Sequence, residues 1–168
     1  GRESSANGED KRRSVGLGLN GNLWTADLKE SLNGKQAMGR VLRFNLHNHG
    51  RILGREPDFS FEGLATDATG NVYVMATDDR NPTADGPIFE FTPSGEQIVF
   101  GSVPGTPDAT QANWGLAFDS AGNLYAADGN AQTIYEFAPD GTPTAFVGPS
   151  AFAPGESPVG LVLDSGGN

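Results

Sequence analysis

An internal repeat is the feature that most constrains what this chain can fold into. A segment that reads GLATDATGNVY at residues 63–73 reads GLAFDSAGNLY at residues 115–125, and a related segment occupies residues 15–24. A fourth copy begins at Val159. Each copy represents one structural unit that cannot bury its apolar face alone, so the repeat is the first guide to the fold.

The spacing of the copies indicates the kind of unit. Phe44, Phe91 and Phe137 lie at the same point of three copies, 47 and 46 residues apart. A period in the forties, with several strands per unit, is typical of β-propeller blades rather than of ankyrin, tetratricopeptide or leucine-rich repeats. Because the 168 residues include 24 Gly and 11 Pro, we expect few helices.

Turn residues divide each unit into strands. An Asp recurs before a Gly-Asn pair, where the Asp starts a type I turn and the Gly supplies a positive φ. The residues that we interpret as turn formers, and not as catalytic groups, are Asp67, Asn71, Asp119, Gly122, Asn123 and Asp164. A Pro-x-Gly sequence at residues 93–95 and 139–141 predicts a second hairpin, so each unit has four short strands.

The sequence therefore predicts an all-β fold, a β-propeller of four-stranded antiparallel blades. The predicted blades cover about residues 14–61, 62–112 and 113–158, and the first strand of the next begins within residues 159–168. Residues 1–13 are polar and are predicted to form a flexible tail.

Charge and cysteine content exclude several kinds of partner and site. The chain has 21 acidic and 11 basic residues, a net charge of −10, so nucleic acid is not an expected partner. The absence of cysteine excludes disulfides, Cys-ligated zinc and thiol nucleophiles. No apolar run approaches the roughly 18 residues of a membrane span. The acidic, Gly-rich composition favours a periplasmic or extracellular location.

The pattern of residues 115–128, followed by Ile-x-x-Phe-x-Pro-x-Gly at residues 134–141, resembles the NHL repeat. It is also similar to the six-bladed propellers of the gluconolactonase (senescence-marker) family and of the streptogramin (virginiamycin B) lyases. The resemblance covers residues 14–168 and implies that about three blades plus one strand form half of a six-bladed ring. Three explanations of the open ring remain: a fragment of a longer chain, a dimer that closes the ring, or an arc that another partner caps.

The gluconolactonase resemblance implies a divalent cation in the central channel, held by a Glu and by Asn and Asp residues of later blades. Such oxygen ligands suit calcium or magnesium. Glu62 stands where that Glu would stand, and Asn113 lies one residue before the matching position of the next copy, Trp114. The predicted metal ligands are thus Glu62 and Asn113, and the alternatives for Glu62 are a polar channel residue or a hydrogen-bonded loop acid. No other cofactor is expected.

Four residues form a predicted binding rim: Asp27, Asp78, Asp128 and Trp114. Asp27 and Asp128 close the second strand of their units and face a rim loop. We expect the side chains of Asp27 and Asp128 either to contact a ligand or to cap the rim loop.

The two histidines and three aromatic residues have structural interpretations. His47 and His49, two apart on an extended segment, would face the same side and could hold a metal, but they fall in the turn before the fourth strand. The lyase resemblance implies a catalytic His in the channel, and these turn histidines are the only two in the chain. Trp24, Tyr73 and Tyr125 occupy corresponding places and are interpreted as packing between blades.

No complete catalytic set accompanies the repeat. The sequence therefore favours a non-catalytic binding or scaffolding module whose rim loops and channel mouth contact a partner. One alternative is a divalent-metal-dependent lactone hydrolase or a streptogramin-lyase-like enzyme, and another is a structural subunit of a ring or filament. The expected partner is another protein, or a second copy that completes the propeller.

Overall fold

The structure, a computed structural model, describes residues 10–18, 22–30, 37–45, 47, 49–105 and 114–164. Twelve strands in these ranges form three four-stranded antiparallel sheets. The first sheet contains β1 (Asp10–Leu17), β2 (Leu23–Glu30), β3 (Ala37–Phe44) and β4 (Gly50–Pro57). The second contains β5 (Phe59–Thr66), β6 (Val72–Asp78), β7 (Gly86–Phe91) and β8 (Gln97–Val103). The third contains β9 (Trp114–Phe118), β10 (Leu124–Asp128), β11 (Thr133–Phe137) and β12 (Pro143–Val147), and a short 3₁₀ helix, η2 (Pro149–Ala151), follows.

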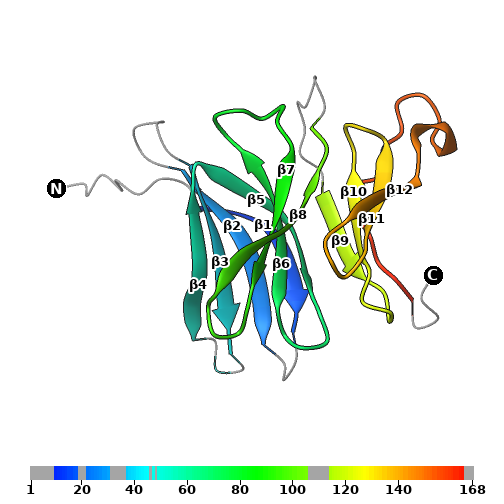
Figure 1. The fold of residues 1–168 in the computed structure, drawn as a ribbon. Coiled ribbons are helices and arrows are strands. Elements are labelled where there is room, and N and C mark those ends of the chain that lie inside the picture. The colour runs from blue at the N-terminus through cyan, green and yellow to red at the C-terminus, as the bar shows by residue number, and fades with distance from the viewer. Residues whose placement is uncertain are drawn as a thin grey trace.

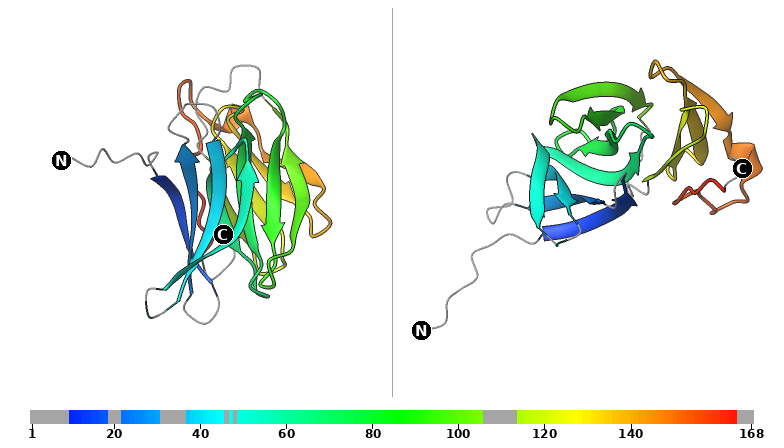
Figure 2. Two further views of the ribbon diagram at one scale, coloured as in Figure 1. Left: turned by 90° about the vertical axis from the view of Figure 1, so that its left-hand side faces the viewer. Right: turned by 90° about the horizontal axis from the view of Figure 1, so that it is seen from below.

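In each sheet the strands lie in chain order, so every connection within a sheet is a hairpin (Figure 1). The sheets follow one another in an arc, which is clearest in the view from below (Figure 2). Their first strands are neighbours, since β5 contacts both β1 and β9. This arrangement confirms the predicted all-β fold of propeller blades. None of the described residues belongs to a helix long and apolar enough to cross a membrane.

The hairpin turns have the predicted chemistry. The Oδ1 of Asp67 accepts hydrogen bonds from the backbone amides of Thr69 and Asn71, each at 2.9 Å, and its Oδ2 accepts one from the Asn71 side chain. Asp119 holds its own turn in the same way, and Gly122 has a φ of 88°. The interpretation of these aspartates as turn formers is therefore confirmed.

Buried phenylalanines pack between adjacent sheets. Phe91 of the second sheet and Phe137 of the third are fully buried. Each packs on a glycine of the preceding sheet: a Cβ at Gly54 would overlap the Phe91 ring, and one at Gly101 would lie 3.0 Å from the Phe137 ring. Because a side chain there would displace the phenylalanine, these glycines are required by close approach.

Two aromatic residues confirm the predicted packing between blades. Trp24 is buried in the core between the first and second sheets, and Tyr73 is buried in the core between the second and third. Tyr125, at the same place in the third sheet, is half-buried and packs edge-to-face on Phe146, with ring centroids 5.1 Å apart.

The first strand begins earlier than predicted. Residues 10–13 were assigned to the tail, yet β1 begins at Asp10 and residues 10–12 pair with residues 27–29 of β2. The boundary at residue 13 is wrong because a strand ladder joins backbone groups and needs no apolar side chains. Residues 1–9 lie outside the described part of the chain.

The register of the first unit differs from the match suggested by the repeat, in which Val15, the first residue of its segment, corresponds to Glu62. Val15 pairs with Thr25 in the way that Leu64 pairs with Val74. Five residues separate β1 from β2, and five separate β5 from β6. Because turns of equal length set the same strand register, Val15 is equivalent to Leu64.

The fourth copy is not a strand over its described residues, 159–164. It nevertheless lies beside β9, because a Cβ at Gly115 would be 2.6 Å from the backbone nitrogen of Leu161. The segment thus occupies the place of a next first strand but pairs with no described strand, and a strand needs such a ladder partner.

Candidate functional site

Glu62 lies in an irregular part of β5. The pairing of β5 with β6 shifts between Phe61 and Leu64, so Glu62 and Gly63 both lie opposite Met75. A bulge of this kind changes the direction of a side chain and is frequent beside active sites. Glu62 is only 8% exposed, which makes it one of the few buried acidic residues of the described chain.

The predicted metal site stays a prediction. Asn113 lies outside the described residues, and Trp114, which pairs with Asp128, takes the place of Phe61 rather than that of Glu62. Within the described ranges, no three His, Asp or Glu residues gather in a way that could hold a metal ion.

Asp78 ends β6 at the rim of the second sheet. Its Oδ1 accepts hydrogen bonds from the backbone amide and the Nε of Arg80, at 2.9 and 3.1 Å. The Nη1 of Arg80 also lies 3.5 Å from the Oδ2 of Asp58. The hydrogen bond from the Arg80 side chain is the main reason why the pKa of Asp78 lies below its ordinary value. This predicted rim residue is thus partly neutralised by Arg80.

Asp128 ends β10 and is fully buried. Its Oδ1 accepts hydrogen bonds from the amides of Asn130 and Ala131, both at 2.9 Å, while its Oδ2 has no partner among the described residues. Burial raises the pKa of this carboxyl group. The contacts are those of a loop cap, one of the two roles that the sequence allowed.

The other two rim residues cannot be placed by their side chains. Asp27 does not close its strand as predicted, because β2 continues to Glu30; it lies opposite Arg40 of β3, and Trp114 begins β9. Both side chains are outside the described part of the chain, so their assignment to the binding rim stays a prediction.

The two histidines lie in the turn between β3 and β4, as predicted. The backbone amides of His47 and His49 both donate to the Oδ1 of Asn45, at 3.0 Å. The two rings are exposed, with centroids 6.5 Å apart. Asn45 therefore shapes this turn, as Asp67 and Asp119 shape theirs.

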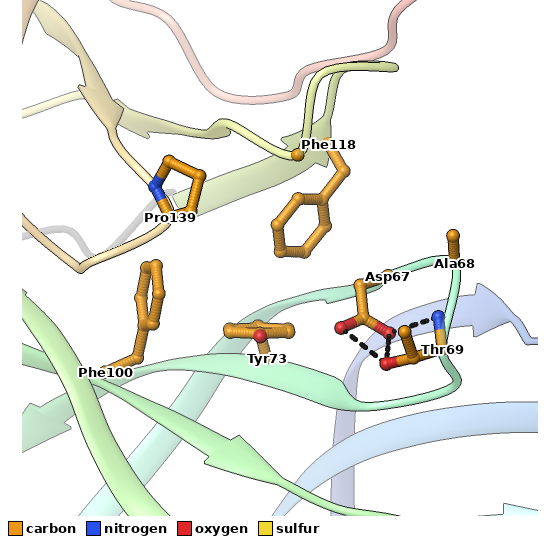
Figure 3. A pocket seen from close by; sticks show the side chains of 8 residues that line it. Asp67, Ala68, Thr69, Tyr73, Phe100, Phe118 and Pro139 are labelled. Carbon is orange, nitrogen blue, oxygen red and sulfur yellow. Dashed lines mark hydrogen bonds between the residues drawn. The ribbon is translucent and has the colours of Figure 1, made fainter.

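A groove between the second and third sheets was not predicted. It has a volume of about 240 Å³ and is lined by Asp67, Ala68, Thr69, Tyr73, Phe100, Phe118, Gly122 and Pro139. We call it the aromatic groove. In Figure 3 the Tyr73 ring lies between the rings of Phe100 and Phe118, with Pro139 across from it. Asp67 and Thr69, joined by a hydrogen bond of 2.9 Å, lie at one end.

The rings of the aromatic groove stand at steep angles to one another. The Tyr73 centroid is 5.0 Å from that of Phe100, at an interplanar angle of 85°, and 4.8 Å from that of Phe118, at 69°. Tyr73 is buried, whereas Phe100 and Phe118 are half-buried, so they leave the groove open to solvent. Edge-to-face pairs of this kind hold aromatic rings in fixed orientations.

The groove also has a negative electrostatic environment. The pKa of the Tyr73 hydroxyl is raised, first by burial and then by the charges of Glu90 and Asp67. Burial likewise raises the pKa of Glu90. Among the described residues, no ion pair neutralises Asp67 or Glu90. The sequence signal for the groove was weak because Phe118 stands at a variable position of the repeat, where the second copy has Thr66, and because Phe100 lies outside the repeat motif.

Comparison with known proteins identifies the fold alone. No protein-family model matches the sequence, and no curated protein is similar enough to count as a match. Among solved structures, a catalytically inactive variant of virginiamycin B lyase from Staphylococcus aureus, determined with quinupristin, is similar with a TM-score of 0.64 and 17% identity. The match covers 99% of this chain and 49% of the lyase.

Two further structures share the fold. A protein of unknown function from Bacteroides caccae has a TM-score of 0.63 and 14% identity, over 94% of this chain and 51% of that one. An extracellular domain described as part of a one-component system from B. thetaiotaomicron has a TM-score of 0.53 and 15% identity, over 94% and 25%. The chain thus spans about half the length of the first two, and its three sheets are those of a β-propeller like virginiamycin B lyase.

Proposed function

We propose that this chain is a non-catalytic binding or scaffolding module, half of a six-bladed propeller whose two open sheet faces are covered by three further blades. The observation that carries the proposal is a difference in exposure at equivalent positions. Val15 of β1 is 63% exposed, whereas Leu64 of β5 is 6% and Leu116 of β9 is 7% exposed. Leu64 and Leu116 each pack on the preceding sheet, and Val15 has no described sheet to pack on.

The opposite end of the arc, at β12, also exposes apolar side chains. Phe146 of β12 takes the place of Phe100 of β8, since each is the extra residue at the shift in its strand pairing. Phe100 is half-buried between sheets, while Phe146 is 60% exposed. Val159 and Val162, in the segment beside β9, are also exposed. Apolar surface gathered at both ends favours a partner that buries it.

A second copy fits both ends if residues 159–164, which lie beside β9 in the place of the next first strand, give way to β1 of the other copy. The Val15 face of one copy would meet the Phe146 face of the other, and a two-fold axis would repeat the contact and close the ring. Three blades from a longer chain would bury the same surfaces. A periplasmic or extracellular location remains part of the proposal, supported by the likeness to an extracellular domain.

The contact can be tested at Leu17, which is exposed on the same strand as Val15. We expect Leu17→Lys to lower the average mass in light scattering, because a buried unpaired charge opposes association. The matched control is Ile98→Lys, a change of an exposed apolar residue on β8, away from the two open faces. Equal masses for the wild type and Leu17→Lys would contradict closure by a second copy and would leave three blades of a longer chain as the cover.

An enzyme of the lyase or lactonase type is the second candidate, favoured by the buried Glu62 in the β5 bulge and by the fold shared with virginiamycin B lyase. Calcium would then raise the melting temperature of the wild type but not of Glu62→Gln, because binding to the folded state stabilises it. Glu96→Gln, in an exposed turn, is the control. Turnover of a lactone or of quinupristin that requires Glu62 would overturn the non-catalytic proposal.

A further inference from the structure

The aromatic groove is specific to one interface and is not a general consequence of the repeat. Tyr73 is equivalent to Trp24 of the first sheet, and Phe118 is equivalent to Thr66, by their places in the strand pairing. At the interface of the first and second sheets, Thr66 donates a hydrogen bond to the carbonyl oxygen of Leu17, at 3.1 Å. Three aromatic rings therefore meet at the second interface, where the first has a threonine.

The three rings form an incomplete box. Tyr73 lies between Phe100 and Phe118, and both of these rings stand steeply to its plane (Figure 3). Aromatic faces carry partial negative charge and attract cations that approach within about 6 Å of the ring centre. An arrangement of several aromatic rings around one space is suited to an ammonium group that carries methyl substituents.

Nearby carboxylates add to this attraction. Asp67 lines the groove, and Glu90 pairs across the strands with Tyr73. Both oxygens of Asp67 already accept hydrogen bonds from Thr69 and Asn71, so this carboxylate supplies negative charge at a distance and is not free to coordinate directly. A cation that needs no hydrogen-bond acceptor suits such a site better than a metal ion does.

We propose that the aromatic groove binds the methylated ammonium group of a small organic cation. Tyr73, Phe100 and Phe118 surround the group, and Asp67 and Glu90 provide the counter-charge. The volume of about 240 Å³ is below the range of about 300–1,000 Å³ for sites that enclose a drug-sized molecule, so the groove fits a head group. This site is separate from the open sheet faces and from Glu62.

The proposal is tested by comparing choline with 3,3-dimethyl-1-butanol, its neutral analogue of nearly the same shape. Each is titrated into the full chain, and binding is followed by NMR through the amide signals of residues 67–71 and 119–123, at the groove. We expect choline to shift these signals in a saturable way, with an affinity about tenfold higher than that of the alcohol. The comparison needs no variant, so a failure to fold cannot obscure it.

Two variants locate the site. Phe118→Thr introduces the residue that stands at this place in the first interface, and we expect it to weaken choline binding about tenfold. Glu90→Gln removes one counter-charge and should weaken binding about threefold at low salt. Val99→Thr, an exposed residue of β8 that lies opposite Phe89 and not opposite Glu90, is the control and should leave the affinity unchanged.

Three results would overturn the proposal. Equal affinities for choline and the alcohol would mean that the groove recognises apolar shape alone. An unchanged choline affinity in folded Phe118→Thr would place the binding elsewhere. The absence of saturable shifts at these residues would mean that the groove binds no ammonium group.

Discussion

The internal sheet interfaces and the open sheet faces use the same positions in different ways. Phe91 and Phe137 are fully buried on the glycines of a preceding sheet, whereas Phe44, their equivalent in the first sheet, is half-buried. Leu64 and Leu116 are buried, and Val15 is exposed. The repeat thus supplies every unit with the apolar residues of an interface, and only the neighbouring blade decides whether they are buried.

The largest expected effect is at an internal interface. Phe137→Ala should lower the free energy of unfolding by about 3–5 kcal/mol, because it empties a fully buried site on Gly101. Phe44→Ala, at the equivalent place on the open face, should cost less than half as much in an isolated chain. Urea denaturation of both variants makes the measurement, and equal losses would remove the distinction between internal and open faces.

A smaller effect is expected from filling the space beneath Phe91. Gly54→Ala places a methyl group against the Phe91 ring and should cost about 1–3 kcal/mol of unfolding free energy. Gly148→Ala is the matched control, because a Cβ there has no neighbour within 4 Å and its φ is −94°. Its effect should stay within about 0.5 kcal/mol. Similar losses in the two variants would mean that the sheets do not pack as closely as described.

The smallest expected effect is a pH-dependent change in stability at the turn between the first two strands of a sheet. The third sheet has Asp119 at the start of this turn, and the first sheet has Gly18. Asp119 is half-buried; burial raises its pKa, but hydrogen bonds from Asn123 and from the turn amides outweigh this and lower the pKa below the ordinary value. Its ionised form therefore stabilises the fold above about pH 4, and that contribution is lost as the pH falls through the lowered pKa. Asp119→Asn should be less stable than the wild type at pH 7, and the difference should shrink toward pH 3.

Gly18 provides the comparison for this turn. It stands in the place of Asp119 in the first unit, and its amide donates to the carbonyl oxygen of Asn22, at 2.9 Å, as that of Asp119 does to Asn123. Gly18 has no side chain to cap the turn, so the first turn should contribute no such pH dependence. Urea denaturation at both pH values checks this, and a difference that grows on acidification would contradict the role given to Asp119.

The repeat allowed much of the fold to be predicted. The turn residues are local signals, since an Asp at the start of a turn and a Gly at positive φ act through nearby backbone groups, and both were recognised. The start of β1 was missed because residues 10–12, which pair with β2 through backbone groups, are polar and give no apolar pattern. The β5 bulge was missed because its glycine, Gly63, recurs as Gly115 in the regularly paired β9, so the glycine alone does not distinguish a bulge from a regular strand.

The candidate sites were harder to predict than the fold. Asp128 was recognised as a residue that closes a strand, but nothing in the repeat motif indicated that it is completely buried. Phe100 and Phe118 form the aromatic groove with Tyr73 although they are far apart in the chain and belong to different sheets. Such a site depends on how two blades meet, and the repeat motif describes each blade separately.

The most direct test of the central claim, that a second copy covers the open faces, is the mass of the chain in solution. Light scattering behind a sizing column, at two protein concentrations, would measure it. We predict a species near twice 17.5 kDa, the mass of one chain, when a second copy closes the ring. Larger, concentration-dependent species would indicate that the same faces join in another arrangement. A monodisperse monomer of 17.5 kDa at both concentrations would contradict the claim.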